Sequence, residues 1–179
     1  MTKLAVYIGT TGGPIRIERI TNEAAALTEV CKGRNIVALL PISEDYENFV
    51  HPGRPVERAF GPFTHPSFRM DISEEIKSGQ SWYLAAFVAH GLARESRLAG
   101  PDETPAGVVW ITGRVNADFG VEPVGHIAEK LRAARSLFEE WAARSVPVTV
   151  CLPQEDTAPA VDLEGVRVAA VADALEVLR

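Results

Sequence analysis

The chain of 179 residues is poor in cysteine and in long apolar segments. Its two cysteines, Cys31 and Cys151, lie far apart and form no CxxC pair, which argues against a disulfide-stapled domain and is typical of a reducing compartment. The apolar run near the start, Leu4 to Ile8, is far shorter than a signal peptide or a membrane span requires. We therefore expect a cytoplasmic protein with no targeting segment and no membrane association.

Positive charge is also scarce. The 18 Lys and Arg residues are outnumbered by 24 Asp and Glu, the formal net charge is -6, and the basic residues are scattered along the chain. Because a phosphate backbone has to be met by clustered Lys and Arg, this composition argues against a nucleic-acid partner. The glycine-rich segment from Gly9 to Pro14 is no phosphate-binding loop, since Gly13 is followed by proline instead of lysine and a hydroxyl residue.

Histidine is rare and dispersed. None of the four shows the spacing of metal ligands, and we expect neither a metal nor another cofactor. We interpret His51, His65, His90 and His126 as loop or helix-surface residues. His126 stands one turn before Lys130, so the alternative for it is a place at the border of a cleft, with an auxiliary role in proton transfer.

Length and a 46% share of apolar residues predict one α/β (α+β) domain over residues 1–179, with mixed strands and two principal helices. Apolar and alternating segments predict strands over residues 4–8, 15–20, 35–40, 67–73, 108–112, 148–152 and 166–171. Residues 9–14 are expected to form a hairpin turn, residues 43–66 a loop broken by prolines and glycines, and residues 114–121 a hairpin partner for the strand before them. Helices are expected over residues 22–31, 82–94, 124–144 and 172–178.

The helix expected over residues 124–144 carries a lysine at an unusual place. Apolar residues recur on its core face at intervals of 4, 3, 4 and 3, at Ile127, Leu131, Ala134, Phe138 and Trp141. At about 100° per residue, Lys130 falls about 60° from the centre of this stripe. Partial desolvation there would lower the pKa of Lys130 toward the range of a general base. The alternative is that only its aliphatic stem lies along the core edge while the ammonium reaches water.

Ser81 precedes the helix expected over residues 82–94. A serine at this place is either a helix cap or a nucleophile whose oxyanion is stabilised by backbone N–H groups at the helix start. The surrounding sequence lacks the second glycine of a nucleophile elbow and the lysine of a Ser-x-x-Lys motif. The serine alone leaves both interpretations open.

Three segments together resemble the proteolytic domain of Lon proteases, a family of Ser-Lys peptidases. The segment from Gly79 to Tyr83 stands where the family has a Gly-Pro-Ser-Ala-Gly loop that opens a helix, and Thr112-Gly113 ends the next strand as in the family. The segment from Gly125 to Ala134 resembles the family's Gly-Gly-hydrophobic-Lys-Glu-Lys-Leu-x-Ala-Ala sequence. The interval of 18 residues from Thr112 to Lys130 is that of the family. The resemblance covers roughly residues 67–179, and residues 1–66 form a divergent region of strands and loop.

The resemblance implies roles for individual residues. Ser81 takes the place of the nucleophile, Lys130 that of the general base, and Thr112 that of the threonine that orients the lysine. Gln80 replaces the family's proline, and Trp82 and Tyr83 replace its small residues. These three side chains, with His126, are expected to form walls of the site.

The resemblance also implies an activity, which is hydrolysis of peptide bonds in a polypeptide substrate by acyl transfer. The chain has no Walker motif and no room for an ATPase, so a separate ATPase or scaffold protein is the expected partner. Because family members work in rings, a homo-oligomer is expected by analogy. The alternative is a catalytically silent Lon-like domain that serves as a protein-binding or assembly module, for which the bulky Trp82-Tyr83 pair beside the serine is the argument.

Overall fold

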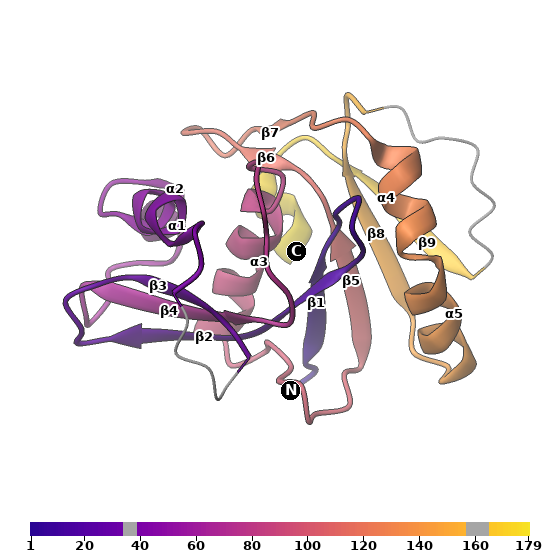
Figure 1. Ribbon diagram of the computed structural model, residues 1–179, viewed down its shortest axis with the longest axis horizontal. Helices are drawn as coiled ribbons and strands as arrows, with labels where there is room; N and C mark the ends of the chain where they lie inside the picture. The colour runs from indigo at the N-terminus through magenta and orange to yellow at the C-terminus, as the bar shows by residue number, and fades with distance from the viewer. Residues whose placement is uncertain (34–38, 157–164) are drawn as a thin grey trace.

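A mixed sheet of seven strands runs through the molecule between two layers of helices (Figure 1). The structure is a computed structural model, which describes residues 1–33, 39–156 and 165–179. The strand order is β3 (Glu29–Lys32), β4 (Ser67–Ile72), β2 (Ile15–Glu23), β1 (Leu4–Ile8), β5 (Gly107–Ile111), β8 (Val148–Pro153) and β9 (Val166–Val171). A separate two-stranded ribbon joins β6 (Arg114–Val115) to β7 (Val121–Glu122). The expected α/β class is confirmed.

The strands that position the site are parallel. β1 pairs with β2 in an antiparallel hairpin, as expected, and its other edge pairs in parallel with β5, which continues in parallel to β8 and β9. The carboxyl ends of β1, β5 and β8 therefore meet at one edge of the sheet. Gly9, directly after β1, lies against Trp110 so closely that a Cβ would come within 2.2 Å of the ring. Thr112 lies at the same edge because it directly follows β5.

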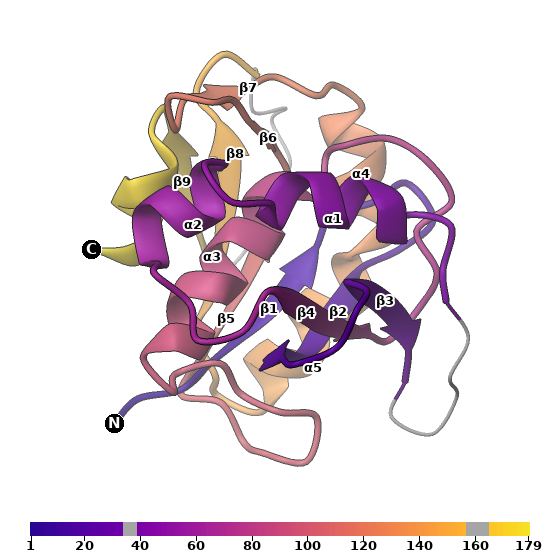
Figure 2. The same ribbon diagram turned by 90° about the vertical axis from the view of Figure 1, so that its left-hand side faces the viewer.

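Alternating side chains give the sheet two apolar faces. In β1, Val6 and Ile8 enter one core, while Ala5 and Tyr7 enter the other. The first face is covered by α1 (Ser43–Val50), α2 (Pro55–Phe60), α3 (Tyr83–Arg94) and the short 3-10 helix η1 (Ala174–Leu178). The second face is covered by α4 (Ile127–Ala133) and α5 (Arg135–Ala143), which lie behind the sheet when α1 and α2 face the viewer (Figure 2).

Most of the expected strands are confirmed, and the helix expected over residues 82–94 is α3. The helix expected over residues 22–31 is wrong, because β2 continues through Glu23 in pairing with β4, and β3 then pairs with the other edge of β4. Of the strand expected over residues 35–40, residues 35–38 lie outside the described part of the chain. Leu39 forms an isolated bridge with Cys31.

The loop expected over residues 43–66 is also wrong, because this segment contains α1 and α2. Tyr46, Phe49 and Val50 form the buried face of α1. Pro55 occupies the first turn of α2, where its missing N–H costs no hydrogen bond and its fixed φ suits a helix. A proline taken from the sequence as a breaker is therefore a helix start.

The long helix expected over residues 124–144 is two helices, which meet at Ala134 with φ −95° and ψ −2°. The apolar stripe predicted for it is nevertheless buried along its whole length. Residues 114–121 form no hairpin with β5, because β1 and β8 already occupy both edges of that strand. The closing helix expected over residues 172–178 is the 3-10 helix η1.

Cys31 and Cys151 are both free and buried. Within the described ranges, no helix has the length and apolar character needed to cross a membrane.

Candidate active site

Lys130 is a buried lysine bound to a buried threonine. Lys130 lies on α4 and is 5% exposed. Its Nζ donates a hydrogen bond of 3.0 Å to Thr112 Oγ1. Thr112, at the end of β5, is fully buried. Burial lowers the pKa of Lys130 below the ordinary lysine value, and the nearby Asp156 carboxylate partly opposes this shift. The predicted contact between Lys130 and Thr112 is thus present.

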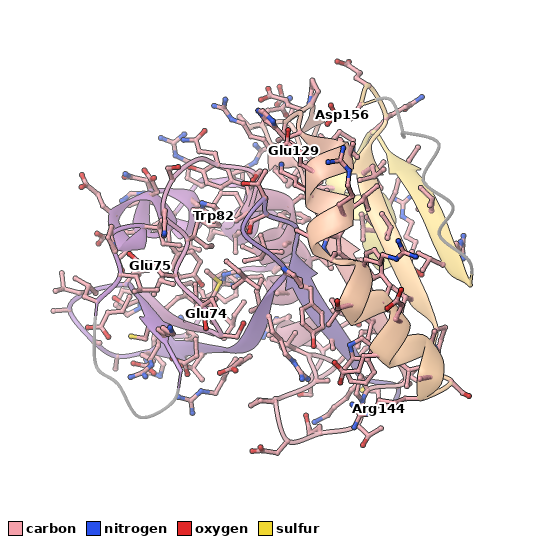
Figure 3. The ribbon with its side chains drawn as sticks, turned by 45° about the vertical axis from the view of Figure 1, so that its right-hand side comes forward. Glu74, Glu75, Trp82, Glu129, Arg144 and Asp156 are labelled. Carbon is pink, nitrogen blue, oxygen red and sulfur yellow. The ribbon has the colours of Figure 1, made fainter. Side chains whose placement is uncertain are left out.

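Asp156 is a contributor that the sequence interpretation missed. Its Oδ2 accepts a hydrogen bond of 2.9 Å from the Val124 amide, and its Oδ1 accepts one of 3.3 Å from Gly125. These bonds fix the turn before α4, where Gly125 and His126 both adopt positive φ. Figure 3 shows Asp156 at the start of α4, near Glu129. An acidic residue just past the carboxyl end of the parallel strand β8 was the available signal.

Ser81 lies, half-buried, in the turn that precedes α3. Its carbonyl accepts a hydrogen bond of 3.0 Å from the Gly113 amide, and the Leu84 amide donates one of 3.1 Å to the Gly113 carbonyl. The start of α3 is therefore bonded to the residue that follows Thr112. This arrangement brings Ser81, Thr112 and Lys130 to one edge of the sheet.

The Ser81 hydroxyl is not engaged in helix capping. The N-cap of α3 is Trp82, and no side chain caps this helix. In the part of the chain that the structure describes, Ser81 Oγ makes no hydrogen bond, and Lys130 Nζ bonds to Thr112 but not to Ser81. Among the described residues, the hydroxyl therefore has no partner that a ligand would have to displace.

Several backbone N–H groups lie next to Ser81 along the chain or are bonded to it. The Tyr83 amide donates to the Gln80 carbonyl at 3.1 Å, and the Gly113 amide is bonded to Ser81. Among the described residues, no acceptor is found for the amides of Ser81 and Trp82. Two unengaged N–H groups next to a serine hydroxyl can stabilise the negative oxygen of a tetrahedral intermediate.

The residues expected as walls of the site differ in position. Trp82 is 1% exposed and points into the core, where its Nε1 donates to the Gly79 carbonyl at 3.0 Å; Figure 3 places it on the side of the sheet opposite to α4. Gln80 and Tyr83 line an open pocket of about 540 Å³. The His126 side chain is 69% exposed and lies 3.6 Å from Glu129.

His90 is a core residue, and its predicted surface position is wrong. It is 3% exposed on α3, with the Tyr46 hydroxyl 2.7 Å from its Nε2. Burial lowers the pKa of His90 to about 3. Over the described ranges, no three His, Cys, Asp or Glu side chains gather in a group that could hold a metal ion.

No protein-family model matches the chain, and no curated protein matches it. The likeness to Lon proteases accordingly rests on the residues themselves.

Proposed function

We propose that the protein is a serine peptidase of the Lon type, in which Ser81 and Lys130 act as a catalytic pair. The observation that carries this proposal is the environment of Lys130. Its Nζ is buried against Thr112 Oγ1 and forms no ion pair with any described residue. A buried ammonium without a counter-ion is costly, so the neutral amine is favoured. A neutral amine is the form that can take a proton from serine.

The chemistry follows from these groups. As Ser81 Oγ attacks the scissile carbonyl, Lys130 takes its proton, and the Ser81 and Trp82 amides stabilise the oxyanion. Lys130 then returns the proton to the leaving amine, and the C–N bond breaks. Water, activated by the same amine, hydrolyses the acyl ester. Thr112 accepts one N–H of Lys130, which holds the amine in place.

The proposed substrate is a polypeptide segment that is already unfolded or exposed. The chain carries no unfoldase motif, so folded substrates would need a separate ATPase or scaffold protein. A homo-oligomer remains part of the proposal by analogy with the family. A cytoplasmic setting also remains part of it, since both cysteines are free.

A binding or assembly module without turnover is the second candidate. The observation in its favour is that Ser81 and Lys130, both described, make no hydrogen bond with each other. Catalytic hydrogen bonds are often formed only when substrate is present, so this observation does not remove the first proposal. The inward position of Trp82 weakens the argument for a blocked site.

Incubation with an unfolded polypeptide such as casein tests the proposal. We expect the wild type to cleave it, Ser81→Ala to lack cleavage, and Ser78→Ala, at an exposed serine three residues upstream, to retain it. Equal cleavage by the wild type and Ser81→Ala would refute the serine mechanism. Absence of cleavage by the wild type, together with a specific partner in a pull-down, would favour the binding module.

A further inference from the structure

The open pocket of about 540 Å³ beside Ser81 is separate from the catalytic groups, since neither Ser81 nor Lys130 lines it. We propose that this pocket binds an acidic side chain of the polypeptide substrate, a glutamate or an aspartate, through Arg54. The inference rests on the proposed function, because it assigns selectivity to the reaction at Ser81.

Several residues that line the pocket are adjacent in sequence to residues of the candidate site. Gln80 and Tyr83, which line it, stand on either side of the Ser81-Trp82 pair. Arg114, on another wall, follows Gly113, whose amide is bonded to the Ser81 carbonyl. A peptide whose scissile carbonyl lies at Ser81 can therefore place a neighbouring side chain in this pocket.

The segment with α1 and α2 completes the pocket. Phe49 of α1 stacks on Tyr83, with ring centroids 4.5 Å apart and an interplanar angle of 29°. The half-buried Tyr83 ring, backed by the buried Phe49, offers an apolar surface for the methylene groups of a substrate side chain. Arg54, the residue before α2, adds a guanidinium to the lining. This segment lies outside the part of the chain that resembles Lon proteases.

The pocket lining carries two arginines, Arg54 and Arg114, and two carboxylates, Asp45 and Glu122. Arg114 Nε lies 3.4 Å from Glu122 Oε2, so these two charges offset each other. Asp45 lies in the first turn of α1, where the helix dipole stabilises a negative charge. Arg54, in contrast, has no ion pair or hydrogen bond within the described residues. It is the cation that remains available, and a guanidinium binds a carboxylate through two parallel hydrogen bonds.

The Tyr83 hydroxyl lies within the field of the same charges. Burial raises the pKa of Tyr83, Asp45 raises it further, and Arg114 and Arg54 lower it. Both arginines thus act on this phenol, which lines the pocket next to the site. A carboxylate held by Arg54 would have the Tyr83 hydroxyl available as a further donor.

Peptide aryl phosphonates with Glu, Leu or Lys next to the phosphorus test the proposal. Ser81 Oγ forms a bond to phosphorus, a phenol leaves with the serine proton, and mass spectrometry measures the rate. We expect the Glu probe to react at least about tenfold faster than the Leu probe, because a hydrogen bond to a charged group is strong. Arg54→Gln should abolish this preference, and Arg54→Glu should reverse it toward the Lys probe. Arg144→Gln, at the residue that caps the C-terminus of α5, is the matched control and should retain it.

A small fluorophosphonate without a side chain separates the two proposals. If it labels Ser81 while the three peptide probes react at equal rates, the pocket assignment is overturned and the proposed function stands. If it fails to label Ser81, the proposed function is overturned. In that case, fluorescence anisotropy of labelled Glu and Leu peptides with the wild-type protein tests whether the pocket binds an acidic side chain. Tighter binding of the Glu peptide that Arg54→Gln removes supports the acidic pocket, and equal binding overturns it.

Discussion

At the scale of single residues, Asp156 tunes Lys130. Its carboxylate raises the pKa of Lys130 against the lowering effect of burial. Asp156→Asn removes this charge but keeps an oxygen that can accept from Val124 or Gly125. We therefore expect the pH at which acylation of Ser81 becomes half-maximal to move to lower values, as measured by stopped labelling at several pH values. A shift to higher pH would show that the carboxylate does not act in this way.

His90 should make the fold sensitive to acid. Its pKa is about 3 in the fold and about 6.5 when unfolded, so the unfolded chain binds the extra proton between these values. The stability that the neutral His90 contributes is fully present above pH 6.5. As the pH falls below this value, the free energy of unfolding decreases by about 1.4 kcal/mol per pH unit. Urea unfolding at pH 4 to 7 should therefore give a shallower pH dependence for His90→Gln than for the wild type.

The exposed His65 supplies the control for this experiment. His65→Gln should keep the slope of the wild type, because it leaves the buried His90 and its surroundings unchanged. Parallel pH dependences for the wild type and His90→Gln would contradict the assigned cause. His90→Gln also loses the contact with Tyr46, which lowers the free energy of unfolding at every pH. The slope of that free energy against pH is therefore the quantity to compare.

At the scale of elements, the approach of α3 to the end of β5 depends on Gly113. A Cβ at this position would lie 3.0 Å from Leu84 and 3.2 Å from Val121. Gly113→Val should push the start of α3 away and separate Ser81 from Thr112, with a loss of stability of about 1–3 kcal/mol. We expect acylation of Ser81 to fall at least tenfold under conditions in which the variant is folded, as measured by labelling and circular dichroism.

Gly12→Ala in the β1–β2 turn is the control, because a Cβ there meets nothing closer than 3.8 Å. It should leave the labelling rate near that of the wild type. Labelling of a folded Gly113→Val at the wild-type rate would mean that the spacing between α3 and β5 does not set the geometry of the site.

The elements differ in how much of them the sequence could predict. The stripe around Lys130 is a local pattern, and its burial was correctly predicted. Of the two alternatives that the sequence left open for the lysine, the structure has the buried one. The break at Ala134 could not be predicted, since no proline or glycine marks it. The strand character of residues 22 and 23 depends on pairing with Phe68 and Ser67, more than 40 residues away. Long-range pairing of this kind overrides local propensity.

At the scale of the whole molecule, the candidate site joins both helix layers. Ser81 comes from the start of α3 on one face of the sheet, Lys130 comes from α4 on the other, and Thr112 lies at the end of the strand between them. The contact between Thr112 and Lys130 was implied by the resemblance to Lon proteases, whose interval of 18 residues this chain shares. For Asp156 the only signal was its place past the end of β8, and its bonds to Val124 and Gly125 form only in the fold. Arg54 was not predictable, since only the folded chain brings it next to Tyr83.

Because the site is built from both helix layers, a substitution in the core far from the site should lower its stability without changing the reaction at Ser81. Phe138 on α5 packs against Trp110, with centroids 6.1 Å apart, within the core of the second face. Phe138→Ala should lower the free energy of unfolding by about 3–5 kcal/mol through the cavity it creates. Labelling of Ser81 in the absence of denaturant should persist, while the urea concentration that abolishes it should fall with the unfolding midpoint. Labelling that survives beyond global unfolding would contradict a site built from both layers.

The rate at which a fluorophosphonate labels Ser81 across the pH range distinguishes a Ser81-Lys130 pair from a serine that acts without the lysine. For the wild type, the rate should rise along one ionisation with a pKa below the ordinary lysine value of 10.5. Lys130→Ala should lose labelling, whereas Lys32→Ala, at an exposed lysine paired with Glu74, should keep the wild-type profile. Equal labelling of the wild type and Lys130→Ala at every pH would contradict a Ser81-Lys130 catalytic pair.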